Sequence, residues 1–154
     1  AVTIGGGWSG SEGSKTGATA MTNDTGGIHL GLSAVTGDLT VAVGFADGDS
    51  IASTGTATND VQVDGEVVKA GVKYVSGDLT FNIGAVSGSA QDSATVGTAG
   101  TTEDSYDKTS ASVSYAVASG VTAVLGYSDV DSANEGSNDD TDGSSWYIGA
   151  NMSF

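Results

Sequence analysis

Apolar residues recur at every second position over short segments of this chain, and this period of two constrains the fold more than any other feature. One phase of each segment carries Val, Ile, Leu, Ala or an aromatic residue, while the other phase is mostly Gly, Ser, Thr and other small or polar residues. Such alternation is typical of a β-strand with one apolar face and one wet face. It argues against a disordered chain, although Gly makes up 25 of the 154 residues.

Eight segments show the alternation, and each has about the length of a tilted transmembrane strand. The strands are predicted near 1–9, 27–35, 38–46, 67–75, 78–87, 109–117, 121–129 and 145–154. Gly-containing pairs at Thr36-Gly37, Ser76-Gly77 and Ser119-Gly120 predict tight hairpins, and long loops rich in Gly, Ser, Thr and Asp connect the other strands. Because every Asp and Glu is assigned to a connection, no carboxylate is expected inside a strand. The chain is expected to be a single all-β, antiparallel unit.

Charge and composition exclude several classes of protein. The chain has 19 acidic residues against 4 Lys and no Arg, with a formal net charge of -15, so it lacks the clustered cations that nucleic-acid binding requires. The absence of Cys excludes disulfide scaffolds and thiolate chemistry. No apolar run has the length of a transmembrane helix, and no leader precedes Ala1, so any signal peptide is expected to have been removed.

The positions of the aromatic residues distinguish a membrane barrel from a soluble β-sandwich. A sandwich core would tend to place its large rings in the middle of strands. Here the rings lie at strand ends, on both sides of a band of Val, Leu, Ile and Ala, as in the aromatic girdles of outer-membrane barrels. The predicted girdle residues are Trp8, Phe45, Tyr74, Tyr115, Tyr127, Trp146 and Phe154. This pattern favours an antiparallel transmembrane β-barrel.

The sequence resembles the bacterial outer-membrane porins. Its ending from Trp146 to Phe154 is similar to the C-terminal strand that the barrel-assembly machinery recognises, with an apolar or aromatic residue at Trp146, Ile148, Ala150, Met152 and Phe154. The stretch from Gly31 to Gly44 looks most like the trimeric general porins of α-proteobacteria, the Rhodobacter-like group. The resemblance implies a bacterial outer-membrane location, contact with lipid and lipopolysaccharide, and a homotrimer.

The inward phase of the strands indicates how wide the barrel is. The interior of an eight-stranded barrel is filled by side chains, whereas a wide aqueous channel has small polar walls. The larger polar groups expected on the wall are His29, Lys69, Lys73, Asn82, Tyr147 and Asn151. They would leave an eight-stranded interior poorly filled. The chain is therefore expected to be the C-terminal half of a sixteen-stranded porin for small hydrophilic solutes and ions. The alternative is a complete eight-stranded barrel with a structural or adhesive surface role.

The chemistry-bearing residues support no enzyme or cofactor on sequence grounds. His29 is the only His, and no strand carboxylate is expected to orient it, so a wall residue is favoured over a catalytic base. Lys69 and Lys73 either tune the charge preference of a channel or are solvated wall residues. The acidic loop does not fit the EF-hand spacing, and weak surface Ca²⁺ binding there competes with simple solvation. Its candidate ligands are Asp129, Asp131, Glu135, Asp139, Asp140 and Asp142.

Overall fold

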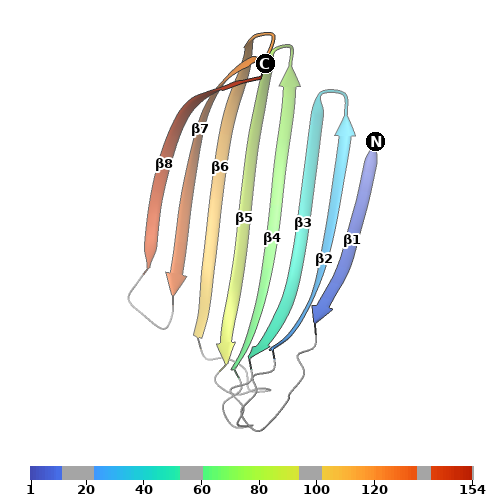
Figure 1. The fold of residues 1–154 in the computed structure, drawn as a ribbon, viewed down its shortest axis with the longest axis vertical. Coiled ribbons are helices and arrows are strands. Elements are labelled where there is room, and N and C mark those ends of the chain that lie inside the picture. The colour runs from blue at the N-terminus through green and yellow to red at the C-terminus, as the bar shows by residue number, and fades with distance from the viewer. Residues whose placement is uncertain (12–22, 53–60, 94–101, 135–139, 154) are drawn as a thin grey trace.

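The fold is a single sheet of eight antiparallel strands (Figure 1). The structure, a computed structural model, describes residues 1–11, 23–52, 61–93, 102–134 and 140–153. Each strand pairs with its neighbours in sequence, in the order β1 to β8. The strands are β1 (Val2–Ser11), β2 (Asn23–Thr36), β3 (Leu39–Ala52), β4 (Val61–Ser76), β5 (Leu79–Ser93), β6 (Thr102–Ala118), β7 (Val121–Asn134) and β8 (Thr141–Met152). The all-β antiparallel fold expected from the sequence is confirmed.

Most strands extend further than the alternation of apolar residues alone suggests. β3 continues to Ala52 and β4 begins at Val61, where a loop over 47–66 had been expected. The expectation that no carboxylate lies inside a strand is therefore wrong. Backbone hydrogen bonds between strands do not require apolar side chains, so pairing continues past the apolar band to positions where charged groups remain hydrated. The acidic strand residues are Asp24, Asp47, Asp49, Asp64, Glu66, Asp92, Glu103, Asp104, Asp107, Asp129, Asp131 and Asp142.

Three tight turns join strands at one end of the sheet, drawn at the top of Figure 1. The glycines predicted to form them have positive φ, at 56° for Gly37, 57° for Gly77 and 75° for Gly120. Only glycine adopts this backbone conformation without strain from a Cβ. In the first two turns the connecting pair is Gly37-Asp38 and Gly77-Asp78, one residue later than the predicted pairs, since Thr36 and Ser76 still belong to strands.

The sheet has no apolar core among the residues that the structure describes. No described hydrophobic side chain is buried, and Ile4 and Ile148 are 79% and 87% exposed. A water-soluble sandwich would bury such residues against a second layer. A single sheet with a continuous apolar face needs lipid or other apolar matter against that face. Within the described ranges, no helix has the length and hydropathy needed to cross a membrane.

Candidate functional site

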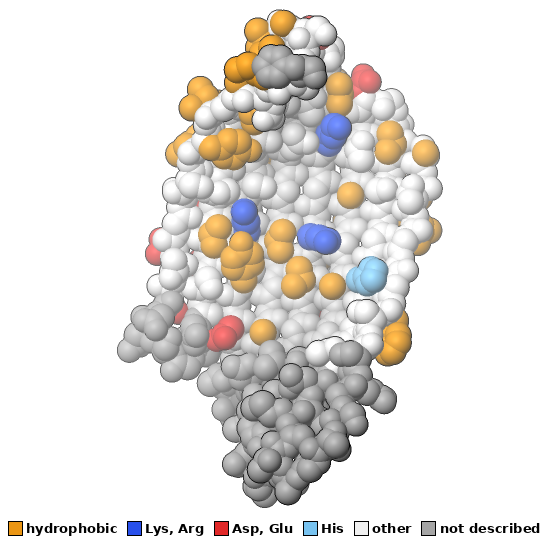
Figure 2. Space-filling view, viewed as in Figure 1, with side chains coloured by type: hydrophobic (Ala, Val, Ile, Leu, Met, Phe, Trp, Pro, Cys, Tyr) orange, Lys and Arg blue, Asp and Glu red, His pale blue; other side chains and the backbone are white. Residues whose placement is uncertain are grey.

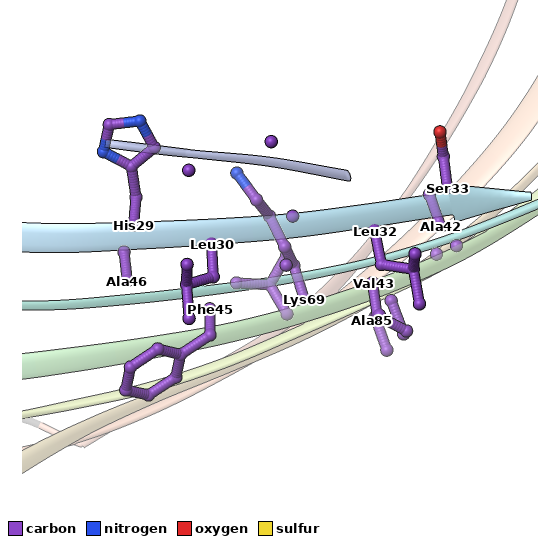
Figure 3. A pocket seen from close by; sticks show the side chains of 18 of the residues that line it. His29, Leu30, Leu32, Ser33, Ala42, Val43, Phe45, Ala46, Lys69 and Ala85 are labelled. Carbon is purple, nitrogen blue, oxygen red and sulfur yellow. The ribbon is translucent and has the colours of Figure 1, made fainter. Parts of the chain in front are cut away.

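The two phases of the strands point to opposite sides of the sheet. Figure 3 shows His29, Ser33 and Lys69 projecting to one side, while Leu30 and Phe45 project to the other. This follows from strand geometry, because successive side chains alternate between the two faces and directly paired residues share a face. We call the side that carries His29, Ser33 and Lys69 the polar face, and the opposite side the apolar face.

The polar face forms a hollow of about 860 Å³ to which strands β1 to β6 all contribute. Figure 2 shows this face, where backbone and small side chains predominate and the Lys and His side chains stand out. Leu30 and Phe45 also border the hollow, but their side chains point to the apolar face (Figure 3). The residues on the polar phase that line it are Thr3, Gly5, His29, Gly31, Ser33, Ala42, Gly44, Ala46, Lys69, Gly71, Gly84, Val86, Lys108 and Ser110. No carboxylate is among the residues that line this hollow.

Large side chains on the polar face lie over glycines of neighbouring strands. The stem of Lys69 crosses Gly44, with Cε only 2.9 Å from where a Cβ on Gly44 would stand. The ring of His29 covers Gly7 in the same way, with Cε1 at 2.7 Å from a Cβ placed there. The ring of Tyr147 lies over Gly126, its direct partner on β7. The wall glycines therefore provide the space that lets these few long side chains lie along the sheet.

The structure adds one cation to the polar face that the sequence analysis missed. Lys108 belongs to β6, and in the ladder it pairs with Val86, which in turn pairs with Lys69. The three residues therefore form one transverse row on the same face, here called the lysine row. The sequence pattern predicts a loop at residue 108, because the apolar alternation begins only at Ala111. Extending the even-numbered phase of this strand backwards would have found it.

The remaining expected wall residues lie nearer the tight turns or the sheet edge. Lys73 pairs with Asn82, and Asn82 pairs with Ser112. The Asn82 amide Nδ2 donates a hydrogen bond to Ser112 Oγ at 3.3 Å. Asn151 pairs with Thr122 on the edge strand β8. The six predicted wall residues therefore share the polar phase without forming one compact cluster.

Charges are segregated between the two faces. Each of the three lysines within the described ranges, Lys69, Lys73 and Lys108, lies on the polar phase. Most acidic strand residues lie on the apolar phase, toward the long-loop end. Some of these carboxylates lie directly opposite one another. On β3 and β4, Asp47 pairs with Glu66 and Asp49 pairs with Asp64. Across β6, β7 and β8, one row contains Asp107, Asp131 and Asp142. Like charges directly opposite each other on a sheet are destabilising.

The predicted girdle residues lie on the apolar face. Trp8 is 73% and Trp146 72% exposed, which suits rings at a membrane interface. The rings of Tyr127 and Trp146 contact each other at a centroid distance of 4.7 Å, and Tyr127 Oη donates a hydrogen bond to Asp129 Oδ2 at 3.0 Å. Tyr74 and Tyr115 lie near the tight turns. Phe154, which belongs both to the predicted girdle and to the expected assembly signal, lies outside the described residues.

The candidate calcium ligands are described only in part. Asp129, Asp131, Asp140 and Asp142 fall in the described ranges, whereas Glu135 and Asp139 lie outside them. Among the described residues, no group of three or more His, Cys, Asp or Glu side chains is arranged to hold a metal ion. The calcium prediction therefore gains no support from the part of the site that the structure describes.

Comparison with known proteins identifies the fold. No protein-family model matches the chain, and the search of curated proteins found no match. Among solved structures, the chain is similar to a loop L8 deletion mutant of OmpT, an outer membrane protein of Vibrio cholerae, with a TM-score of 0.68 and 16% identity over 98% of this chain. It is also similar to OmpT of Vibrio cholerae, with a TM-score of 0.63 and 20% identity over 90% of this chain. A third structure, the alcaligin outer membrane receptor FauA from Bordetella pertussis, has a TM-score of 0.52 and 14% identity over 99% of this chain.

These similarities cover less than half of each solved chain. The chain spans 48% and 47% of the two OmpT chains and 29% of FauA. The structures do not single out the Rhodobacter-like general porins that the sequence resembles. The bacterial outer membrane, where these proteins are located, is the location that the shared fold indicates.

The sequence-based exclusion of enzymatic activity requires correction. It relied on the lone His29 and on an absence of strand carboxylates, and the strands in fact contain many carboxylates. The similarity to OmpT also contradicts it, because a fold shared with that protein gives no ground for excluding catalysis. Enzymatic activity is therefore not excluded for this chain. At 16 to 20% identity the similarity shows the fold alone, and the chain has the fold of an outer-membrane β-barrel protein.

Proposed function

We propose that this chain forms part of the wall of a water-filled porin channel that lets small hydrophilic solutes and ions diffuse across the outer membrane. The observation that carries the proposal is the hollow on the polar face, whose lining on that phase is mostly glycine and other small residues, with the stem of Lys69 and the ring of His29 crossing over glycines. Small polar walls suit a lumen that holds water, because they leave room for solvent and solutes.

The same face supports a wide barrel over a narrow one. Eight strands could close only a narrow barrel whose interior is filled by side chains. The polar face has too few large side chains for that role. The chain also spans about half the length of the OmpT structures to which it is similar. We therefore favour the C-terminal half of a sixteen-stranded porin, of the α-proteobacterial type that the sequence resembles, assembled as a homotrimer in contact with lipopolysaccharide.

The second candidate is a complete eight-stranded barrel with a structural or adhesive surface role. Its support is the strand count, since eight antiparallel strands in one sheet are enough to close the smallest outer-membrane barrels. In that case the acidic long-loop end would be the interaction surface.

Two measurements on the detergent-extracted, unheated protein distinguish the candidates. The first is the mass of one folded barrel, and the second is single-channel conductance in a planar bilayer. A porin predicts a barrel of about twice 15.0 kDa and large, steady openings. A lone barrel of 15.0 kDa that conducts no current would contradict the porin proposal and favour the surface protein.

A further inference from the structure

We propose that the lysine row, Lys69 with Lys108 across Val86, makes the hollow an attractive site for small inorganic anions, so that the channel prefers anions to cations. The inference rests on the proposed channel function and deepens it. It runs against the formal net charge of -15, which would suggest a preference for cations if every charge acted on the lumen equally.

The register of the sheet is the first support. Lys69 pairs with Val86 and Val86 pairs with Lys108, so the two lysines lie on one face, two strands apart. Neighbouring strands are about 4.8 Å apart, which places the two lysine Cα atoms roughly 10 Å from each other. An anion that passes along this part of the wall is therefore within reach of both long, flexible side chains.

The floor of the hollow is the second support. Gly44 lies under the Lys69 stem, and Gly31 and Gly5 continue the same row on β2 and β1. A Cβ on Gly44 would stand 2.9 Å from Lys69 Cε, so a larger residue there would push the lysine away from the wall. Figure 3 shows the Lys69 amino group on the same side of the sheet as His29 and Ser33. The ammonium group therefore lies over a floor without side chains, open to an ion.

The placement of the carboxylates is the third support. None lines the hollow. Asp104 shares the phase of Lys108 but lies four residues further toward the long-loop end, roughly 13 Å along the strand. Asp107, the chain neighbour of Lys108, pairs with Asp131 on the opposite face. Asp104 is therefore separated from the lysine row by distance, and Asp107 by the sheet itself.

The experiment measures ion selectivity with the full-length protein in a planar bilayer, from the reversal potential in a gradient of KCl. The wild-type channel should prefer chloride to potassium. Replacing both lysines (Lys69→Gln with Lys108→Gln) should lower the chloride-to-potassium permeability ratio by at least about threefold, the effect of one unit charge at roughly 7 Å in water. A difference in gel migration between the unheated and the heated protein verifies that each variant is folded.

Asp107→Asn is the matched control. It removes a charge next to Lys108 in sequence, but on the other face. If the facing of each charge decides selectivity, this variant should leave the reversal potential unchanged. If the net charge of the whole protein decides it, Asp107→Asn should shift the potential as far toward anions as Lys108→Gln shifts it toward cations, and that result would overturn the proposal.

A second readout separates this inference from the channel proposal. The line width of the chloride NMR signal reports anion binding to the detergent-solubilised protein, whether or not it conducts. Broadening that disappears in the double lysine variant but persists in Asp107→Asn supports the anion site. A conducting channel that prefers potassium overturns the anion site alone, and a silent barrel overturns the channel. If the barrel conducts no current, the chloride signal alone tests the anion site. The absence of lysine-dependent broadening would then overturn the anion site.

Discussion

Introducing a lysine on each face of β2 in turn tests which face meets lipid and which meets water. Leu32 and Ser33 are adjacent in sequence and project to opposite sides of the sheet (Figure 3). Leu32 lies four residues from Thr36, the last residue of β2 at the tight-turn end. At about 3.4 Å per residue and a strand tilt near 40°, Leu32 is roughly 10 Å inside that end, close to the middle of an apolar band about 25 Å tall.

The depth of Leu32 sets the size of the expected effect. A lysine on the lipid face near the midplane costs roughly 2–4 kcal/mol, and the cost falls to about 0–1 near the interfaces. Leu32→Lys should therefore destabilise the folded barrel by an amount in the upper part of this range. Ser33→Lys adds the same charge to the polar face, which is hydrated in the proposed channel, and hydrated surface substitutions usually change stability by less than about 0.5 kcal/mol.

Denaturant titration in lipid vesicles, followed by Trp fluorescence, measures both variants against the wild type. The difference between the two lysine variants removes effects common to the added charge. Equal destabilisation by Leu32→Lys and Ser33→Lys would refute the reasoning, because it would mean that the polar face is packed rather than hydrated. That outcome would also favour the complete eight-stranded barrel, whose interior has no room for a new lysine.

Three further predictions follow from single residues. Gly37→Val should slow refolding and destabilise the β2–β3 hairpin, because Gly37 has a φ of 56° that a β-branched residue rarely adopts; equal unfolding midpoints for variant and wild type would contradict this. Asp131→Asn should stabilise the barrel by roughly 0.2–1 kcal/mol at low ionic strength, since it relieves repulsion from the directly opposite carboxylates on β6 and β8, and the gain should shrink when salt is added to the denaturant titration. Trp146→Ala should cost at least about 0.5–1.5 kcal/mol through loss of the ring contact with Tyr127, and a double-mutant cycle with Tyr127→Ala should show coupling of that size; additive effects would argue against the contact.

The glycines of the tight turns could be predicted from the sequence, and the alternation of apolar residues predicted the face of each flanking strand residue. A two-residue turn sets the register of the strands it joins, and the predicted pairs Thr36-Gly37 and Ser76-Gly77 imply a register of β2 with β3 and of β4 with β5 that differs from the one observed around Gly37-Asp38 and Gly77-Asp78. The facing of Lys69 and Lys73 follows from the same alternation. Their placement on one wall therefore needed no tertiary information.

The strand ends and the acidic rows could not be predicted in this way. Beyond the apolar band both phases become polar, as at Asp47 and Asp49 on β3, so the period that reveals a strand disappears while its backbone pairing continues. For the same reason Lys108 was assigned to a loop. The alternation of apolar residues marks only the part of each strand that faces the apolar band, whereas the strand itself extends beyond that band into the aqueous region.

The sequence alone indicated where the strands and the turn glycines lie and how each strand divides into an apolar and a polar face, because each of these features depends on residues close together in the chain. The tertiary structure decided the register across the long connections, which local residues do not set, since a long loop allows many pairings of the strands it joins. That register places Lys108 in one row with Lys69 and aligns Asp107 with Asp131 and Asp142 on the other face. The face of each charge follows from the alternation within its own strand, whereas the rows in which like charges meet are a property of strand pairing that no single segment of the chain contains.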